Sequence, residues 1–414
     1  MNPFREIGRL AASEKSFVFF SMLTCFCIGL EYAITRPASQ SIFLSLFSTE
    51  AIPYAWLWTV PLNLGVVTLY NWLQPRFGPL RTLGLATFTI VSVHLLTAFI
   101  VPHFPQFIFF QYCWKDIYIL LMFKQLWSMI HSTISSSKAK ALYGAIFGMG
   151  TVGSIVGSSV TGFFAPLVGS ENLFLLTLPI YALLFFAYRQ SYHVSGLLTI
   201  KQTEPEKLRA REGFSMIAKN RYLLGVLLLV VFMQISVALV EYQFNHAIEV
   251  AVPDKDLRTA AMGKLMGLIN TLSLLLQFVG SFLLLQFLGL KRSHFLVPVL
   301  LCSAAFLYLF NPSFMAIAFA FIFTKSIDFS LFGVIREMLF VPLKLDEKFR
   351  AKAVIDVFAY RTSKAVASLV LLGLQFWVGN RVFAISSSVS IAIFVLWLAT
   401  VALLFRKEPE KISI

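Results

Sequence analysis

The stretch TKSIDFSLFGVIREMLFVPLKLDEKFRAKAVIDVFAYRTSK, from Thr324 to Lys364, sets charged residues inside two apolar segments that flank a basic loop. Charge at membrane depth is costly, so a charged side chain there usually marks a binding site, an ion pathway or an ion pair. The charges within the two segments are Lys325, Asp328, Arg336, Glu337, Asp356, Arg361 and Lys364. The stretch therefore predicts a membrane protein with a charged interior.

The composition of the whole chain agrees with this prediction. Of 414 residues, 58% are hydrophobic and 13% are charged, which is more apolar surface than a soluble protein of this length can bury. The net charge of +14 comes from basic residues in short loops between apolar runs. That distribution is typical of cytoplasmic loops and argues against a nucleic-acid partner.

The sequence shows no sign of an enzyme or a cofactor site. The four cysteines lie inside apolar runs, without the spacing of a disulfide framework or a zinc site. The sequence also lacks a metal-ligand cluster, a nucleophile elbow and a phosphate-binding loop. We therefore expect neither catalysis nor a bound metal.

A membrane-spanning helix needs about 20 apolar residues, and by that measure the chain contains about twelve spans. We predict an all-α integral membrane protein whose spans are Ser16–Ile34, Ile52–Leu73, Leu80–Val101, Pro105–Ile130, Leu142–Val168, Leu173–Tyr188, Tyr222–Phe244, Ala261–Leu288, Phe295–Phe310, Phe314–Leu339, Val354–Val378 and Ile385–Leu404. The first span is expected to be retained, because no cleavage site follows it.

Loop charges predict the orientation of these spans in an inner or plasma membrane. Lysine and arginine are concentrated in alternate loops, which places both termini in the cytoplasm. The longest polar segment separates the sixth and seventh spans, and we expect a short surface helix in it. The predicted organisation is a six-helix bundle at residues 1–190, a cytoplasmic linker at 191–220 and a second bundle at 221–414.

The two halves of the chain resemble each other. Asp116 and Lys124 lie 212 residues before Asp328 and Arg336, so the fourth and tenth spans each hold an acid and, two helical turns later, a base. Lys325 has no counterpart at this spacing, where residue 113 is a cysteine.

Two further pairs of positions repeat at nearly the same spacing. Glu31-Tyr32 recurs as Glu241-Tyr242 after 210 residues, and Gly78 recurs as Gly289 after 211. These matches predict a parallel duplication of a six-helix unit, as in major-facilitator transporters.

Charged residues and tyrosines inside the spans are the candidate functional residues. Cations outnumber acids there, which favours an anionic substrate, because lysine and arginine both bind phosphate. The residues expected to bind substrate are Arg36, Lys115, Lys264, Lys325, Tyr32 and Tyr242. Those expected to couple or gate transport are Glu31, Glu241, Asp116, Lys124, Asp328, Arg336, Asp356 and Arg361. The alternative is structural: some of these residues pair with each other, and those near span ends extend towards the interface.

A dinucleotide-like motif, GMGTVG at residues 148–153, lies inside an apolar helix without a preceding strand. We interpret its glycines as part of a helix-packing face. That face comprises Gly144, Gly148, Gly153, Gly157 and Gly162.

Three motifs carry a resemblance to a known family. Arg336-Glu-Met-Leu-Phe-Val-Pro-Leu, Lys352-Ala-Val-Ile-Asp-Val-Phe-Ala-Tyr-Arg361 and Tyr32-Ala-Ile-Thr-Arg36 resemble signatures of the ATP:ADP antiporter family. The resemblance implies a major-facilitator-like fold and exchange or proton-coupled uptake of nucleotides. After Arg36 the family motif continues with two acids and a lysine, whereas this chain reads Pro37-Ala-Ser-Gln40.

Three hypotheses follow from the sequence. The first is a nucleotide carrier, exchanging ATP for ADP or taking up related nucleotides by alternating access. The second is a proton-coupled transporter of another organic anion. The third is a membrane scaffold without transport activity, which the short linker disfavours because it leaves no room for a soluble domain.

Overall fold

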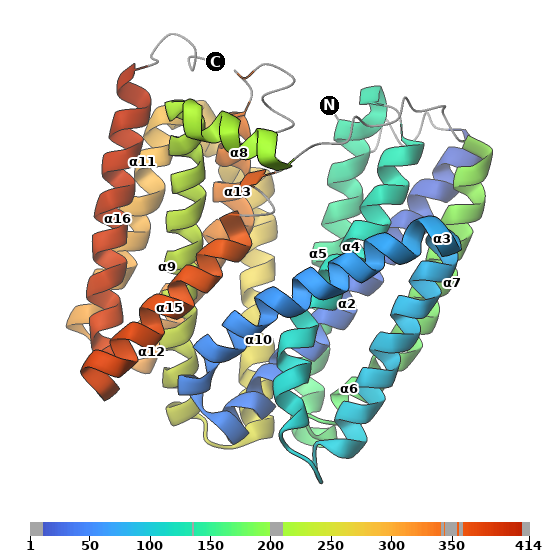
Figure 1. Cartoon of the computed structure of the whole chain (residues 1–414), viewed down its shortest axis with the longest axis horizontal. Coiled ribbons are helices and arrows are strands. Elements are labelled where there is room, and N and C mark those ends of the chain that lie inside the picture. The colour runs from blue at the N-terminus through green and yellow to red at the C-terminus, as the bar shows by residue number, and fades with distance from the viewer. Residues whose placement is uncertain are drawn as a thin grey trace. The chain divides into compact units, whose positions relative to one another are not determined.

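The computed structural model describes residues 11–134, 136–198, 210–340, 343, 354–355 and 359–407. Every regular element in these ranges is a helix, as Figure 1 shows. The longer helices are α2 (Ala12–Phe47), α3 (Ile52–Ile100), α4 (Phe107–Thr133), α5 (Ser136–Val168), α7 (Leu178–Leu198), α9 (Arg221–Ala251), α10 (Lys255–Leu275), α11 (Ser281–Phe310), α12 (Phe314–Ile327), α15 (Tyr360–Val378) and α16 (Val382–Lys407). The shorter ones are η1 (Thr49–Ala51), α6 (Leu173–Leu176), α8 (Ala210–Lys219), η2 (Leu276–Gly280), η3 (Asp328–Phe332), α13 (Gly333–Met338) and η5 (Gly379–Arg381).

These helices confirm the predicted fold class. Among the described residues, nine helical segments are long and apolar enough to cross a membrane, and Thr362–Val378 is a shorter apolar helix. Helix α3 contains two of the predicted spans, and α4, with its internal charges, corresponds to a further one. Helix α8 lies in the polar segment where a short helix is expected.

The same backbone break occurs in α3 and α11. Gly78 has φ 76° and ψ 165°, and Gly289 has φ 70° and ψ 173°, a region that residues with a side chain rarely adopt. The hydroxyl four residues later donates to the glycine carbonyl in both helices, from Thr82 at 2.8 Å and from Ser293 at 2.6 Å. The internal repeat therefore extends from the sequence to the backbone conformation.

The described helices form two compact units. The first contains the described residues of Met1–Ser48, Trp58–Glu204 and Val252–Asn270. The second contains those of Thr49–Leu57, Pro205–Ala251 and Thr271–Ile414. Each unit thus includes a segment from the other half of the sequence. The predicted division into bundles at 1–190 and 221–414 remains a prediction.

The two exchanged segments are related by the repeat, since Thr49 and Thr259 lie 210 residues apart. In the second unit, the Thr49 amide donates to Glu249 Oε2 at 2.9 Å. In the first, the guanidinium of buried Arg258 donates to the hydroxyl and carbonyl oxygens of Ser41 at 3.1 and 2.9 Å. Polar contacts therefore hold each segment in its unit.

Helices α2 and α5 pack closely in the first unit because glycines line their contact. A Cβ atom on Gly153 would lie 2.1 Å from the Phe26 carbonyl oxygen, and one on Gly157 would lie 2.2 Å from that of Leu30. The predicted packing face is therefore right for Gly153 and Gly157.

The same prediction is wrong for Gly144 and Gly148. A Cβ atom on either residue would have no other atom within 4 Å. Gly150 packs against Cys25 of α2 instead, because residues 150, 153 and 157 share one side of α5. The dinucleotide-like motif is thus a helical segment with a packing role.

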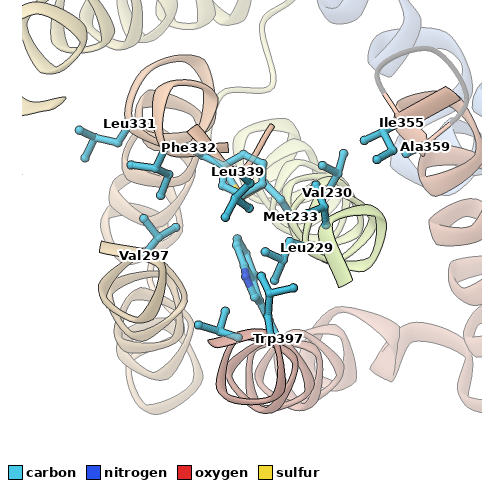
Figure 2. Close-up of a cluster of buried hydrophobic side chains, with 14 of the residues drawn as sticks. Leu229, Val230, Met233, Val297, Leu331, Phe332, Leu339, Ile355, Ala359 and Trp397 are labelled. Carbon is cyan, nitrogen blue, oxygen red and sulfur yellow. The ribbon is translucent and has the colours of Figure 1, made fainter. Parts of the chain in front are cut away.

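The core of the second unit surrounds Trp397 of α16. Figure 2 shows its indole among side chains of other helices, including Leu229 and Met233 of α9 and Val297 of α11. Phe332 packs edge-on against Trp397, with ring centroids 5.5 Å apart. This core fixes the helices that carry the charged residues of the second unit.

Candidate functional site

A charged cluster in the first unit joins α2 to α4. Lys115 of α4 is only 3% exposed, and its ammonium group donates to Asp116 Oδ1 at 3.3 Å and to the Tyr112 carbonyl at 3.0 Å. The Tyr32 hydroxyl of α2 donates to the same Asp116 oxygen at 3.1 Å. Three residues singled out in the sequence therefore meet at one carboxylate.

Aromatic faces contact the cations of this cluster. Lys115 Nζ lies 3.7 Å from the ring centroid of Tyr112, and the Arg36 guanidinium lies 5.9 Å from that of Tyr32. Both distances fall within the range of cation–π attraction. Such a surface suits an anion attached to a flat ring system, because cations and aromatic faces occur side by side.

Lys124, further along α4, contacts a different group of residues. Its ammonium group donates to the Asn71 side chain and lies 4.9 Å from the ring centroid of Tyr70. Asp116, two turns earlier, contacts Tyr32 and Lys115. The contacts that define these two residues therefore belong to separate groups.

In the second unit, a buried ion pair connects α12 to α9. Lys325 Nζ donates to Glu241 Oε2 at 2.7 Å, and the two residues are 6% and 7% exposed. The rings of Phe321 and Phe329 each have their centroid 5.8 Å from the ammonium nitrogen. The structure thus joins a residue predicted to bind substrate to one predicted to couple transport.

Asp328 begins a π-helical turn, η3, directly after α12. Its carboxylate accepts a hydrogen bond of 2.9 Å from the Gln234 amide of α9. Arg336, on α13, contacts its neighbour Glu337 at 3.4 Å. A π-helical turn widens the helix locally and is frequent at functional sites.

The remaining predicted site residues lie in varied surroundings. Tyr242 is fully buried, accepts a 2.7 Å hydrogen bond from the Gln375 amide and stacks on Phe383. Lys264 is exposed on α10, with its aliphatic chain against Gly162.

Two predicted coupling residues cannot be placed in this way. Asp356 lies outside the described residues. The same holds for the side chain of Arg361, although its backbone belongs to α15.

Lys325 does have a counterpart in the other half of the chain. Lys115 precedes it by 210 residues, the spacing that also relates Glu31 to Glu241. The spacing of 212 residues hides this pair, because the matches shift by two residues along the repeat. Each half therefore carries one buried lysine, in α4 and in α12.

Sequence reasoning missed a buried polar network around Glu31. The Tyr118 hydroxyl donates to Glu31 Oε1 at 2.8 Å, and Thr35 is 2.8 Å from the Tyr118 oxygen. His94 Nε2 lies 3.8 Å from the same glutamate oxygen. In the sequence His94 is a single polar residue in an apolar run, so no local pattern identifies it.

The chemistry of both clusters is that of anion and proton binding. Buried lysines can bind phosphate groups, and buried carboxylates can neutralise those lysines when substrate is absent. No group of three side chains suited to hold a metal occurs in the part of the chain that the structure describes.

Comparisons with known proteins agree with this chemistry. The sequence model of the TLC ATP/ADP transporter family matches residues 103–311 and 301–407. The ADP,ATP carrier protein 1 of Chlamydia trachomatis serovar D is 24% identical, over 94% of this chain and 88% of that protein. The ADP,ATP carrier protein 3 of Rickettsia typhi is 22% identical, over 89% of each chain.

Solved structures share the fold at low sequence identity. A point mutant of the nucleoside transporter NupG has a TM-score of 0.66 at 10% identity, covering 94% of this chain and 100% of that one. A bacterial homologue of the human lysosomal transporter Spinster has a TM-score of 0.61 at 12% identity, covering 98% and 99%. The fold is therefore that of major-facilitator-like transporters.

Proposed function

The chain belongs to the TLC ATP/ADP transporter family, and on that premise we propose that its substrate is a nucleotide exchanged or taken up by alternating access. It is a multi-pass membrane transporter and not an enzyme. The observation that carries the proposal is the family match from residue 103 to residue 407, which includes both buried lysines.

The geometry around the two lysines supports a phosphate-bearing substrate. Lys115 contacts Asp116, and Lys325 contacts Glu241, so each ammonium group has a carboxylate partner inside the apolar core of a helix bundle. A phosphate group entering either cluster would compete with that carboxylate for the lysine. Binding of substrate would thereby release an acid to carry a proton or to move.

Aromatic rings beside these cations support a nucleobase or another flat group. Tyr32 and Tyr112 contribute such faces beside Arg36 and Lys115. The proposal assigns substrate binding to Arg36, Lys115, Lys325 and Tyr32. Glu31, Glu241, Asp116 and Asp328 are assigned to coupling or gating.

The second candidate is proton-coupled transport of another organic anion. It is favoured by Pro37-Ala-Ser-Gln40, which replaces the charged continuation of the family's first-helix motif. Charges that assist nucleotide exchange in the family are therefore absent from this segment.

Uptake into vesicles that contain the purified protein distinguishes these candidates. Labelled ATP, ADP, other nucleotides and small organic acids would each be offered with and without a proton uncoupler. Uptake of one or more nucleotides supports the first candidate. Uptake of organic acids alone, abolished by the uncoupler, supports the second and overturns the first.

We also propose an orientation for the chain. Basic residues in alternate loops favour cytoplasmic termini in an inner or plasma membrane. On this orientation the turn between α9 and α10, which contains Asp254, faces away from the cytoplasm.

A further inference from the structure

Glu31, His94 and Thr177 form a chain of polar contacts inside the first unit. They come from α2, from α3 and from the residue between α6 and α7. Their exposed fractions are 2%, 0% and 0%. The His94 Nδ1 atom lies 3.0 Å from the Thr177 hydroxyl oxygen, and its Nε2 atom lies 3.8 Å from Glu31 Oε1.

The hydrogen bond of Thr177 determines the tautomer of His94. The Thr177 hydroxyl donates to the Phe174 carbonyl at 2.6 Å, so its single proton is already used. Its oxygen must then accept from His94, and Nδ1 carries a hydrogen. In neutral His94 the lone pair of Nε2 consequently faces the carboxyl group of Glu31.

An ionised Glu31 beside a neutral His94 would set two electron-rich atoms face to face in a buried site. One additional proton resolves this conflict, either as a carboxylic acid pointing at Nε2 or as an imidazolium paired with the carboxylate. We propose that Glu31 and His94 together form a proton-binding site that holds one proton in this conformation.

The groups that face this site come from every helix around it. Tyr118 of α4 donates to Glu31, and Tyr181 of α7 has its ring 5.6 Å from that of His94. Tyr32 follows Glu31 on α2 and contacts Asp116. These phenols remain neutral near physiological pH, so the carboxyl–imidazole pair is the part of the network that titrates.

The site is adjacent to the charged cluster of the first unit. Tyr118 and Lys115 lie three residues apart on α4, which places them on one face of the helix. A proton on the pair therefore changes the charge about one helical turn from Lys115. If the proposed nucleotide transport is right, a proton gradient can drive it through this site.

Spectroscopy of the purified protein in lipid tests the site without any substrate. Near neutral pH, the infrared spectrum should contain a protonated carboxyl band that Glu31→Gln removes, or the nitrogen spectrum should contain an imidazolium signal that His94→Gln removes. Glu14→Gln and His103→Gln are matched controls, in α2 and in the turn after α3, and should change neither signal. An ionised Glu31 beside a neutral His94 overturns the proposal.

Vesicle transport then separates this proposal from the proposed function. In protein that takes up nucleotide, an imposed proton gradient should accelerate uptake, and Glu31→Gln should abolish the acceleration. Nucleotide uptake that ignores the gradient in a protein lacking both spectroscopic signals would overturn the proton site and leave the function intact. A proton signal in a protein that takes up no nucleotide would overturn the function and support the site.

Discussion

Lys325 of α12 and Glu241 of α9 form a buried ion pair, with the ammonium nitrogen 2.7 Å from the carboxylate oxygen. The pair links two helices of the second unit. An isolated charge at this depth is costly, so each partner stabilises the charged state of the other. A phosphate group that reaches Lys325 would take over the role of Glu241.

Replacing Lys325 by methionine should have two separable effects. Stability should fall by about 3–5 kcal/mol, because Glu241 is left as a buried acid without its cation. Nucleotide affinity should also fall, because the point charge for phosphate is lost. Thermal unfolding of the purified protein and a nucleotide-binding titration measure the two effects.

The double variant Glu241→Gln with Lys325→Met is the matched control. It removes both charges, so we expect much of the stability to return while the affinity remains low. Normal nucleotide affinity in the double variant would assign Lys325 a structural role only.

The contact between α2 and α5 predicts a sharp contrast between two glycines of one motif. Gly153→Ala should lower stability by about 1–3 kcal/mol, because the new Cβ atom would overlap the Phe26 carbonyl. Gly148→Ala has open space and should be neutral or slightly stabilising. Thermal unfolding of the two variants checks this, and equal losses would contradict the packing role.

The exchanged segment of the first unit depends on Arg258. Arg258→Gln should destabilise the protein by about 2–3 kcal/mol, because buried oxygens of Ser41 would lose charged hydrogen-bond donors. Arg381→Gln removes the same charge from an exposed position, and its effect should stay within about 0.5 kcal/mol. Two unfolding midpoints that fall by the same amount would refute the role given to Arg258.

The proposed orientation predicts which side of the membrane each loop faces. In a background without Cys25, Cys27, Cys113 and Cys302, a cysteine at Asp254 should react with an impermeant reagent added outside intact cells. A cysteine at Lys219, which is also exposed, should react only after the cells are opened. The reverse pattern would place the termini on the opposite side.

The fold was largely accessible from the sequence because apolar length, loop charge and repetition are local properties. The spacing of 211 residues between Gly78 and Gly289 anticipated a shared structural feature, and both glycines do adopt the same backbone break. The predicted twelve-span, major-facilitator-like class is confirmed. The exchange of Thr49–Leu57 and Val252–Asn270 was not predictable, because it depends on contacts distant in sequence.

The site was accessible only in part. Intramembrane charge identified Lys115, Lys325 and Glu241, but the sequence did not indicate that Lys325 and Glu241 are partners. His94 carries no distinguishing local pattern, and its relation to Glu31 arises from tertiary packing of α3 against α2. The tautomer argument also needs the hydroxyl of Thr177, another helix away. The roles of Asp356 and Arg361 remain predictions.

Counterflow is the most direct test of nucleotide transport by this chain. Vesicles containing the protein would be loaded with unlabelled nucleotide or left empty, and uptake of labelled ATP and ADP would be followed in both. Faster uptake of label into loaded vesicles, lost in Lys325→Met, is the predicted result for exchange. The absence of nucleotide uptake in loaded and empty vesicles alike, from correctly folded protein, would contradict the account.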